Sequence, residues 1–114
     1  MPKTLVVYID DQRIPITVPE FALEDNAVYR KMDADMDRGW QISRDWVDHP
    51  NLEQRLQVAA DRILGAVENE NEQVAVMMAG YILTRAPQIK AVRISTSGEI
   101  QETELLTEED PLFF

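Results

Sequence analysis

Apolar residues alternate with polar ones near both ends of the sequence, whereas in the middle they recur every three or four positions. Successive side chains on a strand point to opposite faces, and side chains three or four apart share one face of a helix. The order is therefore two strands, three helices and two strands. This order predicts an α+β fold with an N-terminal β-hairpin, a three-helix middle and a C-terminal β-hairpin, in which helices cover one face of an antiparallel sheet.

The first hairpin is predicted over residues 4–18, TLVVYIDDQRIPITV. With the turn at residues 10–13, three apolar pairs face each other, namely Leu5 with Val18, Val7 with Ile16 and Ile9 with Ile14. All six side chains then share one face of the pleat. Pro15 cannot donate to a hydrogen-bonded ladder, so its strand is expected at an edge or with the proline nitrogen facing outward. The segment resembles the opening hairpin of β-grasp domains of the ubiquitin and ferredoxin type.

The first helix is predicted after Asp25 or Asn26, either of which can cap its N-terminus. Its apolar stripe continues as far as Val47, and Gly39 is the position where the helix can bend or break. The residues of the stripe are Tyr29, Met32, Met36, Trp40 and Val47.

The second and third helices also carry start signals. Asn51 and Gln54 have the spacing of a capping box, and the apolar face of the helix that follows consists of Leu52, Leu56, Ala59, Ile63 and Val67. Asn71 is the predicted cap of the third helix, which ends before Pro87. That helix is apolar on nearly all sides, so we expect it to be the central one, with Met78 and Ile82 in the core.

The second hairpin is predicted over residues 90–105. A two-residue turn would place Ile94 and Ile100 on opposite faces of the sheet. A three-residue loop at residues 96–98, with Gly98 in a left-handed conformation, places them on the same face. We therefore expect the three-residue loop, which is a common hairpin connection.

The composition restricts the class of protein. The formal net charge is −10, and an acidic surface repels the phosphates of DNA and RNA. The absence of cysteine excludes disulfides, iron–sulfur clusters and thiolate metal sites. The apolar runs are too short for a signal peptide or a membrane span. We therefore expect an acidic cytoplasmic protein of bacterial type, with no cofactor and with neither nucleic acid nor membrane among its partners.

Three aspartates at alternate positions, Asp33, Asp35 and Asp37, resemble the start of a calcium-binding EF-hand loop. Such a loop needs a glycine at its sixth position and a glutamate at its twelfth. Counted from Asp33, these positions hold Arg38 and Arg44. On a helix, the three acids instead have basic neighbours three or four positions away. We therefore expect a charged helical face, and a divalent-metal site at the three aspartates is kept as an alternative.

Trp40 and Trp46 are candidates to line a pocket or a subunit interface, or to belong to the core. His49 is the single histidine, and no motif marks a nucleophile near it. The glutamates could perform acid–base chemistry only if burial separated their pKa values, and exposure is expected for all of them. They include Glu68, Glu70, Glu72, Glu99, Glu102 and Glu104. A small carboxylate-dependent enzyme with a pocket near Trp40 and Trp46 is the alternative function.

The domain is predicted to span residues 1–106, and residues 107–114, TEEDPLFF, form an acidic, Phe-terminated tail. The tail is similar to the acidic, Phe-terminated tails with which bacterial single-stranded-DNA-binding proteins dock onto partner enzymes. Alternatively, Leu112, Phe113 and Phe114 fold back over the sheet or form a dimer contact, because either arrangement removes apolar surface from water.

These features favour a small cytosolic, non-catalytic binding or accessory protein that acts through protein–protein contacts. Its partner is expected to be another protein or a second copy of the chain in a homodimer. No catalytic residue is assigned. The predicted contact residues are Trp40, Trp46, Leu112, Phe113 and Phe114.

Overall fold

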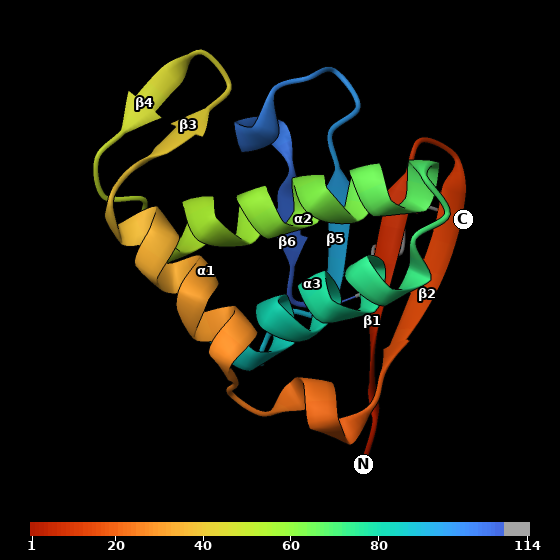
Figure 1. Ribbon diagram of the computed structural model, residues 1–114. Coiled ribbons are helices and arrows are strands. Elements are labelled where there is room, and N and C mark those ends of the chain that lie inside the picture. The colour runs from red at the N-terminus through yellow and green to blue at the C-terminus, as the bar shows by residue number, and fades with distance from the viewer. Residues whose placement is uncertain (109–114) are drawn as a thin grey trace.

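Strands from the two ends of the chain form one layer, and the helices between them cover one face of that sheet (Figure 1). The computed structural model describes residues 1–108. The sheet has the strand order β2-β1-β5-β6. Its strands are β1 (Lys3–Ile9), β2 (Gln12–Val18), β5 (Ala91–Ile94) and β6 (Glu104–Leu106). The predicted α+β class, with strands at both ends and helices in the middle, is confirmed.

The layer over the sheet contains three α-helices. They are α1 (Ala27–Asp37), α2 (Leu52–Glu68) and α3 (Glu72–Arg85). A short 3-10 helix, η1 (Glu20–Leu23), connects β2 to α1. A bilayer-spanning helix needs about 20 apolar residues, and no helix within residues 1–108 meets that requirement.

The first hairpin has the predicted face but a different register. Leu5 pairs with Ile16 and Val7 pairs with Ile14, so the pairing is displaced by two residues from the predicted one. Asp10 adopts a φ of 53° in a turn that is two residues shorter than predicted. Aspartate tolerates this left-handed conformation better than most residues. A displacement by two residues leaves every side chain on its predicted face, because the period of a strand is two.

Pro15 lies on the open edge of the sheet, as predicted. It pairs with Val6, and β2 is an outer strand. The N–H of Val6 donates to the carbonyl of Lys90 at 3.1 Å, so the backbone of Val6 points away from β2. In an antiparallel pair, the residue directly opposite then also directs its backbone N–H and C=O away from the partner strand. The nitrogen of Pro15 therefore faces the outer edge of the sheet, and its lack of an N–H costs no hydrogen bond within the sheet.

The centre of the sheet corrects the prediction of an antiparallel sheet. β1 and β5 are parallel, with Val6 beside Ala91 and Ile9 beside Ile94, so the sheet is mixed. The helices supply the long crossover that parallel neighbours require. The apolar pattern specifies which face of a strand is buried but not the direction in which the strand runs, and it therefore could not distinguish the two arrangements.

The first helix is shorter than predicted. It ends at Asp37, and Gly39 follows with a φ of 104°. The next residues form a separate two-stranded hairpin of β3 (Trp40–Ile42) and β4 (Asp45–Val47). The indole of Trp46 folds over Gly39, where an added Cβ would lie only 2.5 Å from the ring. The helical stripe predicted as far as Val47 was wrong, because apolar spacings of four and seven residues continue through this hairpin, whereas the helix ends next to Gly39, where a break was considered.

The predicted helix caps are confirmed. The side chain of Asn26 accepts from the N–H of Tyr29 at 3.0 Å, and that of Asn71 accepts from Val74 at 3.2 Å. Asn51 and Gln54 form a capping box with two bonds of 2.8 Å. Each cap satisfies N–H groups that have no partner inside the helix.

The third helix is central, as predicted. Residues 78–83 are all buried, including Met78 and Ile82. They pack in one apolar cluster with Leu5 and Val7, which lie on the helix-covered face of the sheet. The predicted burial of Met78 and Ile82 is confirmed, and contacts surround the second half of the helix, whereas its first residues, 72–74, are exposed.

The second hairpin has a longer connection than predicted. Ala91 pairs with Leu106, and the connection of residues 95–103 contains a short 3-10 helix, η2 (Ile100–Glu102). Gly98 has the expected positive φ, at 91°. The buried side chain of Gln57 in α2 donates to the carbonyls of Gln101 and Thr103 at 3.2 and 3.1 Å. The three-residue loop was wrong because this bond from α2 holds a wider loop.

Replacing Gly80 with alanine should destabilise the protein by about 1–3 kcal/mol, because the added methyl group would overlap the Tyr29 hydroxyl and the Ala22 carbonyl. These two groups are hydrogen-bonded to each other at 2.7 Å and cannot both move away without losing that bond. Urea unfolding monitored by circular dichroism measures the change.

Gly65→Ala is the matched control for Gly80→Ala. Gly65 also lies within a helix, but nothing is within 4 Å of the position of an added Cβ. Alanine there should raise stability by about 0.5–1 kcal/mol through its higher helix propensity. A Gly80→Ala variant that gains stability in the same way would show that α3 does not pack closely at this position.

Candidate functional site

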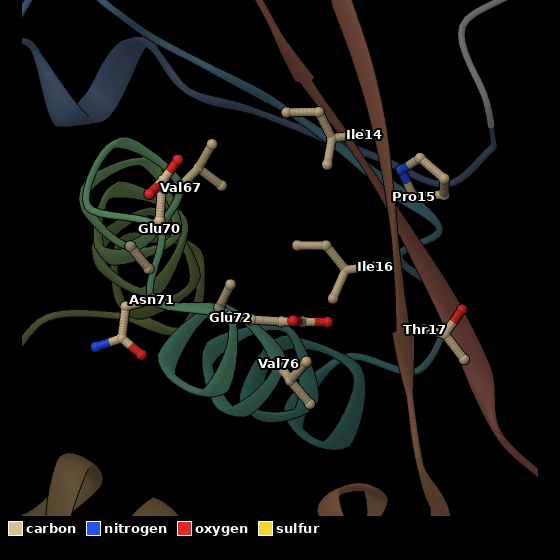
Figure 2. A pocket seen from close by; sticks show the side chains of 11 residues that line it. Ile14, Pro15, Ile16, Thr17, Val67, Glu70, Asn71, Glu72 and Val76 are labelled. Carbon is tan, nitrogen blue, oxygen red and sulfur yellow. The ribbon is translucent and has the colours of Figure 1, made fainter.

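A groove of about 520 Å³ lies between the outer edge of β2 and the turn that joins α2 to α3 (Figure 2). We call it the β2 groove. Its lining consists of residues 14–17 of β2, Ala66 and Val67 of α2, Glu70 and Asn71 of the turn, and Glu72, Ala75 and Val76 of α3. Ile14 and Ile16 point towards the helices in Figure 2, so aliphatic side chains from three elements face one another beside β2, the outermost strand of the sheet within residues 1–108.

The turn beside the groove has a defined backbone geometry. The N–H of Asn71 donates to the carbonyl of Ala66 at 2.7 Å, and the N–H of Glu70 donates to that of Val67 at 3.2 Å. This pair of bonds is a Schellman motif, in which glycine is the usual residue at the left-handed position. Glu70 occupies that position with a φ of 55°. A glutamate side chain is thus held beside the groove in a conformation that costs about 1–2 kcal/mol for a residue with a Cβ.

Glu70 and Glu72 are the only charged residues among those that line the β2 groove. Both are exposed, and neither forms an ion pair with any residue that the structure describes. The groove therefore combines apolar walls with two carboxylates that no cation of residues 1–108 neutralises.

A second hollow of about 470 Å³ adjoins the groove on α3. It shares Glu72 and Val76 with the β2 groove and adds Gln73, Met77 and Phe21. We call it the Phe21 hollow. Phe21 belongs to η1 and is 70% exposed. Because two residues line both hollows, a single segment of a partner could contact both at once.

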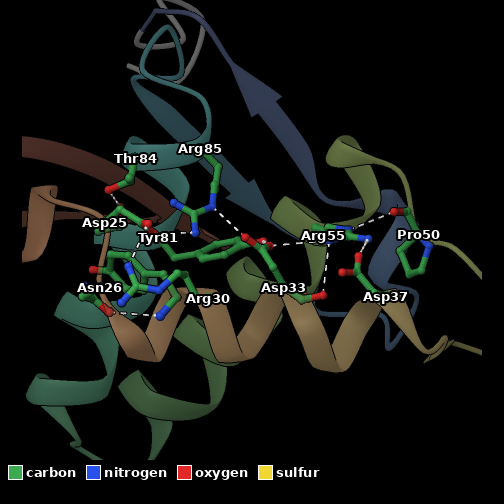
Figure 3. Close-up of polar contacts among 12 residues, drawn as sticks. Asp25, Asn26, Arg30, Asp33, Asp37, Pro50, Arg55, Tyr81, Thr84 and Arg85 are labelled. Carbon is green, nitrogen blue, oxygen red and sulfur yellow. Dashed lines mark hydrogen bonds and ion pairs between the residues drawn. The ribbon is translucent and has the colours of Figure 1, made fainter.

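The acids of α1 are arranged differently from those of the groove. Figure 3 shows Asp33 between Arg85 on one side and Arg55 on the other. Its carboxylate accepts from the Tyr81 hydroxyl at 2.5 Å and from Nε of Arg85 at 2.9 Å, and it lies 3.6 Å from Arg55. Charged hydrogen bonds of this kind are stronger than neutral ones. Asp33 therefore ties α1 to both α2 and α3.

The same two arginines bind further aspartates. Arg85 donates to Asp25 at 2.9 Å, and Arg55 donates to Asp37 at 2.6 Å. Arg30 adds a second bond to Asp25 at 3.0 Å. We call these residues, together with Asp33 and Tyr81, the charge cluster. It contains three aspartates and three arginines, so its formal charges balance.

The charge cluster changes the proton affinities of its members. Burial raises the pKa of the Tyr81 phenol above its usual range, and the hydrogen bond to Asp33 acts in the same direction. Hydrogen bonds from Arg85 and then Arg30 lower the pKa of Asp25. At neutral pH the phenol is therefore protonated and Asp25 is ionised. These are the states that the observed hydrogen bonds require, and they are consistent with a structural role.

The three aspartates considered for a metal lie on the helix that the sequence predicted. Asp33 and Asp37 bind the arginines of the charge cluster, and Asp35 accepts from Lys31 at 2.9 Å. Within residues 1–108, no group of three or more histidine, cysteine, aspartate or glutamate residues is arranged to hold a metal ion. The helix geometry spreads the three carboxylates among different cations rather than directing them to one point.

Within the part of the chain that the structure describes, Trp40 borders only a small hollow and Trp46 lies on the surface. Trp40 packs against the core, and the Arg62 guanidinium lies 5.3 Å from its ring centre. The hollow beside Trp40 has a volume of about 20 Å³, room for about one water molecule. Trp46 is 59% exposed and lies over Gly39. The structure therefore offers little space for the alternative of an enzyme at this place.

The predicted contact residues of the tail, Leu112, Phe113 and Phe114, lie outside the described residues. Their role stays a prediction. By contrast, Phe21 was not singled out by the sequence, and Glu70 and Glu72 were considered only among the exposed glutamates for acid–base chemistry, not as part of a groove. A glutamate in a polar turn gives no signal, since the groove forms only when β2 lies beside the α2–α3 turn. The one available clue was that Phe21 is a large apolar residue in a connector.

No protein-family model, curated protein sequence or solved structure matches the chain. The chemistry of the residues that line the β2 groove is therefore the basis for proposing a function.

Tyr81→Phe should destabilise the folded protein by about 1–3 kcal/mol at neutral pH, because Asp33 loses a charged hydrogen bond. The difference should shrink above about pH 10. The raised pKa of Tyr81 means that its contribution is fully present below the pKa of the unfolded chain and is lost as pH rises towards the folded pKa. Urea unfolding at about pH 8 and about pH 11 tests this. A difference that is equal at both pH values would contradict the role given to the hydroxyl.

Proposed function

We propose that the protein is a non-catalytic binding protein that holds a cationic, apolar segment of a partner protein in the β2 groove. The observation that carries this proposal is the pair of unneutralised carboxylates, Glu70 and Glu72, above aliphatic walls. Elsewhere, on α1, the aspartates are matched by arginines and a lysine of the same chain. The missing positive charge at the groove is supplied by the partner.

The two parts of the groove contribute in different ways. Apolar side chains of the partner gain about 25 cal/mol for each Å² that they remove from water. Exposed ion pairs contribute less, about 0.2–1 kcal/mol each, but they set orientation and accelerate encounter. The net charge of −10 attracts a basic partner over a longer range and repels nucleic acid. Apolar contact thus supplies affinity, and the two glutamates supply selectivity for lysine and arginine.

A second copy of the chain is a poorer occupant of this groove than a basic protein. In a symmetric dimer the same patch of both subunits meets itself. Glu70 and Glu72 of one copy would then face the same residues of the other, and like charges at an interface are unfavourable. The homodimer expected from the sequence would therefore have to use a different surface.

The backbone of Glu70 supports a role for its side chain. Glycine would fit the left-handed position of the turn without strain, yet glutamate stands there. Strain of this kind is retained where the side chain serves a purpose other than folding. A carboxylate at the mouth of an apolar groove provides such a purpose.

Binding can be measured with two fluorescein-labelled peptides of about 14 residues, both made of leucine and lysine in the same proportions. One has leucines at helical spacing and the other alternates leucine with lysine. Of the two peptides, the one that the wild-type protein binds more tightly should bind the Glu70→Gln/Glu72→Gln variant about fivefold more weakly, because two charge pairs are lost. Fluorescence anisotropy gives the dissociation constants, and amide chemical shifts of the protein locate the bound peptide.

Asp48→Asn/Glu53→Gln is the control variant for this experiment. It removes the same charge from two exposed acids that line neither hollow and form no described ion pair. The affinity of this control variant for the same peptide should remain within about twofold of the wild-type value. Equal weakening by both variants would show that the peptide responds to overall charge, and the proposal would fail.

Glu70→Gly should raise the stability of the free protein by about 1 kcal/mol while weakening peptide binding. Glycine relieves the left-handed backbone conformation but removes one carboxylate from the groove. Thermal unfolding and anisotropy on the same sample measure the two effects. A variant that gains stability and binds as well as wild type would show that Glu70 does not contact the partner.

A further inference from the structure

We infer that the segment held in the β2 groove is an amphipathic α-helix rather than an added β-strand, and that it extends over α3 to Phe21. This inference rests on the proposed function and specifies the shape of the partner. Two independent features carry it: the hydrogen-bonding capacity of the β2 edge, and the continuity of the two hollows across Glu72 and Val76.

The edge of β2 is poorly suited to receive another strand. The N–H of Val6 donates to Lys90, so Pro15 opposite Val6 directs its backbone towards the open edge. Proline has no N–H to offer there. An added strand would therefore meet a gap in the middle of the ladder, and proline on an outer strand is a known means of preventing such pairing.

A helix avoids this difficulty because it satisfies its backbone groups internally. It needs only a complementary apolar surface, and its side chains at every third or fourth position can pack into the spaces of another helix. On α3 the groove-lining residues Glu72, Ala75 and Val76 have that same spacing of three and four. The wall of the groove is thus a helix face on which a second helix can lie.

Phe21 provides the second anchor. It is 70% exposed and lines the Phe21 hollow together with Val76 and Met77, so the apolar surface there is contiguous. The backbone next to Phe21 is held in place, because the carbonyl of Ala22 accepts from the Tyr29 hydroxyl at 2.7 Å. A partner helix that crosses α3 at Glu72 and Val76 would place apolar side chains in both hollows and a basic side chain next to Glu72.

The two peptides described above separate the alternatives. The peptide with helical spacing should bind at least about tenfold more tightly than the alternating peptide, and its helical circular dichroism should increase when it binds. Changes in amide chemical shift should appear at Ile14, Ile16, Thr17 and Phe21. Phe21→Ser should raise the dissociation constant of the helical peptide about tenfold. Leu52→Ser, which changes another half-exposed apolar residue that lines neither of these two hollows, should leave the affinity within about twofold.

Three results would contradict the inference, and each has a distinct meaning. If the alternating peptide binds the groove more tightly, the partner is a strand, and the proposed function stands. If the helical peptide binds but Phe21→Ser and Leu52→Ser behave alike, the helix does not reach Phe21. If neither peptide binds, the proposed function itself fails.

Discussion

The close approach of α3 to the Ala22 carbonyl and the Tyr29 hydroxyl determines where the other helical elements lie. Gly80 permits it because any side chain at that position would collide with both groups. The ring of Tyr29 meets the ring of Tyr81 edge-on, with their centres 5.8 Å apart, and the guanidinium of Arg85 lies over both rings. This contact places the start of α3 between the edge of β2 and η1, and both hollows follow from that placement.

Acidic residues serve two purposes on this chain. On α1 they are held by arginines from α2 and α3, and the resulting bonds join the three helices without leaving a net local charge. At the start of α3 they have no cationic partner among the described residues, and they face solvent beside apolar walls. A high negative charge by itself says only that the protein is soluble and repels anions. Under the proposed function, the unpaired acids that bind a partner are those placed beside apolar walls, and exposed unpaired acids elsewhere, such as Asp48 and Glu53, take no part.

Much of the fold could be predicted because local chemistry determined it. The caps at Asn26, Asn51 and Asn71 depend on residues three positions away, and the burial of Met78 follows from the composition of its own helix. The outward position of Pro15 follows from its missing N–H. In each case the cause and the structure lie within a few residues of each other.

Most of the errors concern contacts that no short sequence pattern specifies, and the register of the first hairpin, which depends on the turn at Asp10, is the exception. The parallel pairing of Val6 with Ala91, the folding of Trp46 over Gly39, and the bond from Gln57 to the loop at Thr103 each join residues whose proximity no local pattern encodes. The β2 groove belongs to the same category. The candidate site was therefore the least predictable part, because a groove is formed by elements that meet and not by any one of them.

The parallel pairing in the centre of the sheet also affects how the protein is made. Ribosomal synthesis proceeds from the N-terminus, so β1 and β2 can pair early, whereas β5 emerges only after all three helices. Until then, the inner edge of β1 has no neighbouring strand, and its apolar residues are at risk of pairing with other chains. Pro15 protects the outer edge of the same hairpin from the beginning. The nascent chain thus has one vulnerable edge rather than two, and completing β5 closes it.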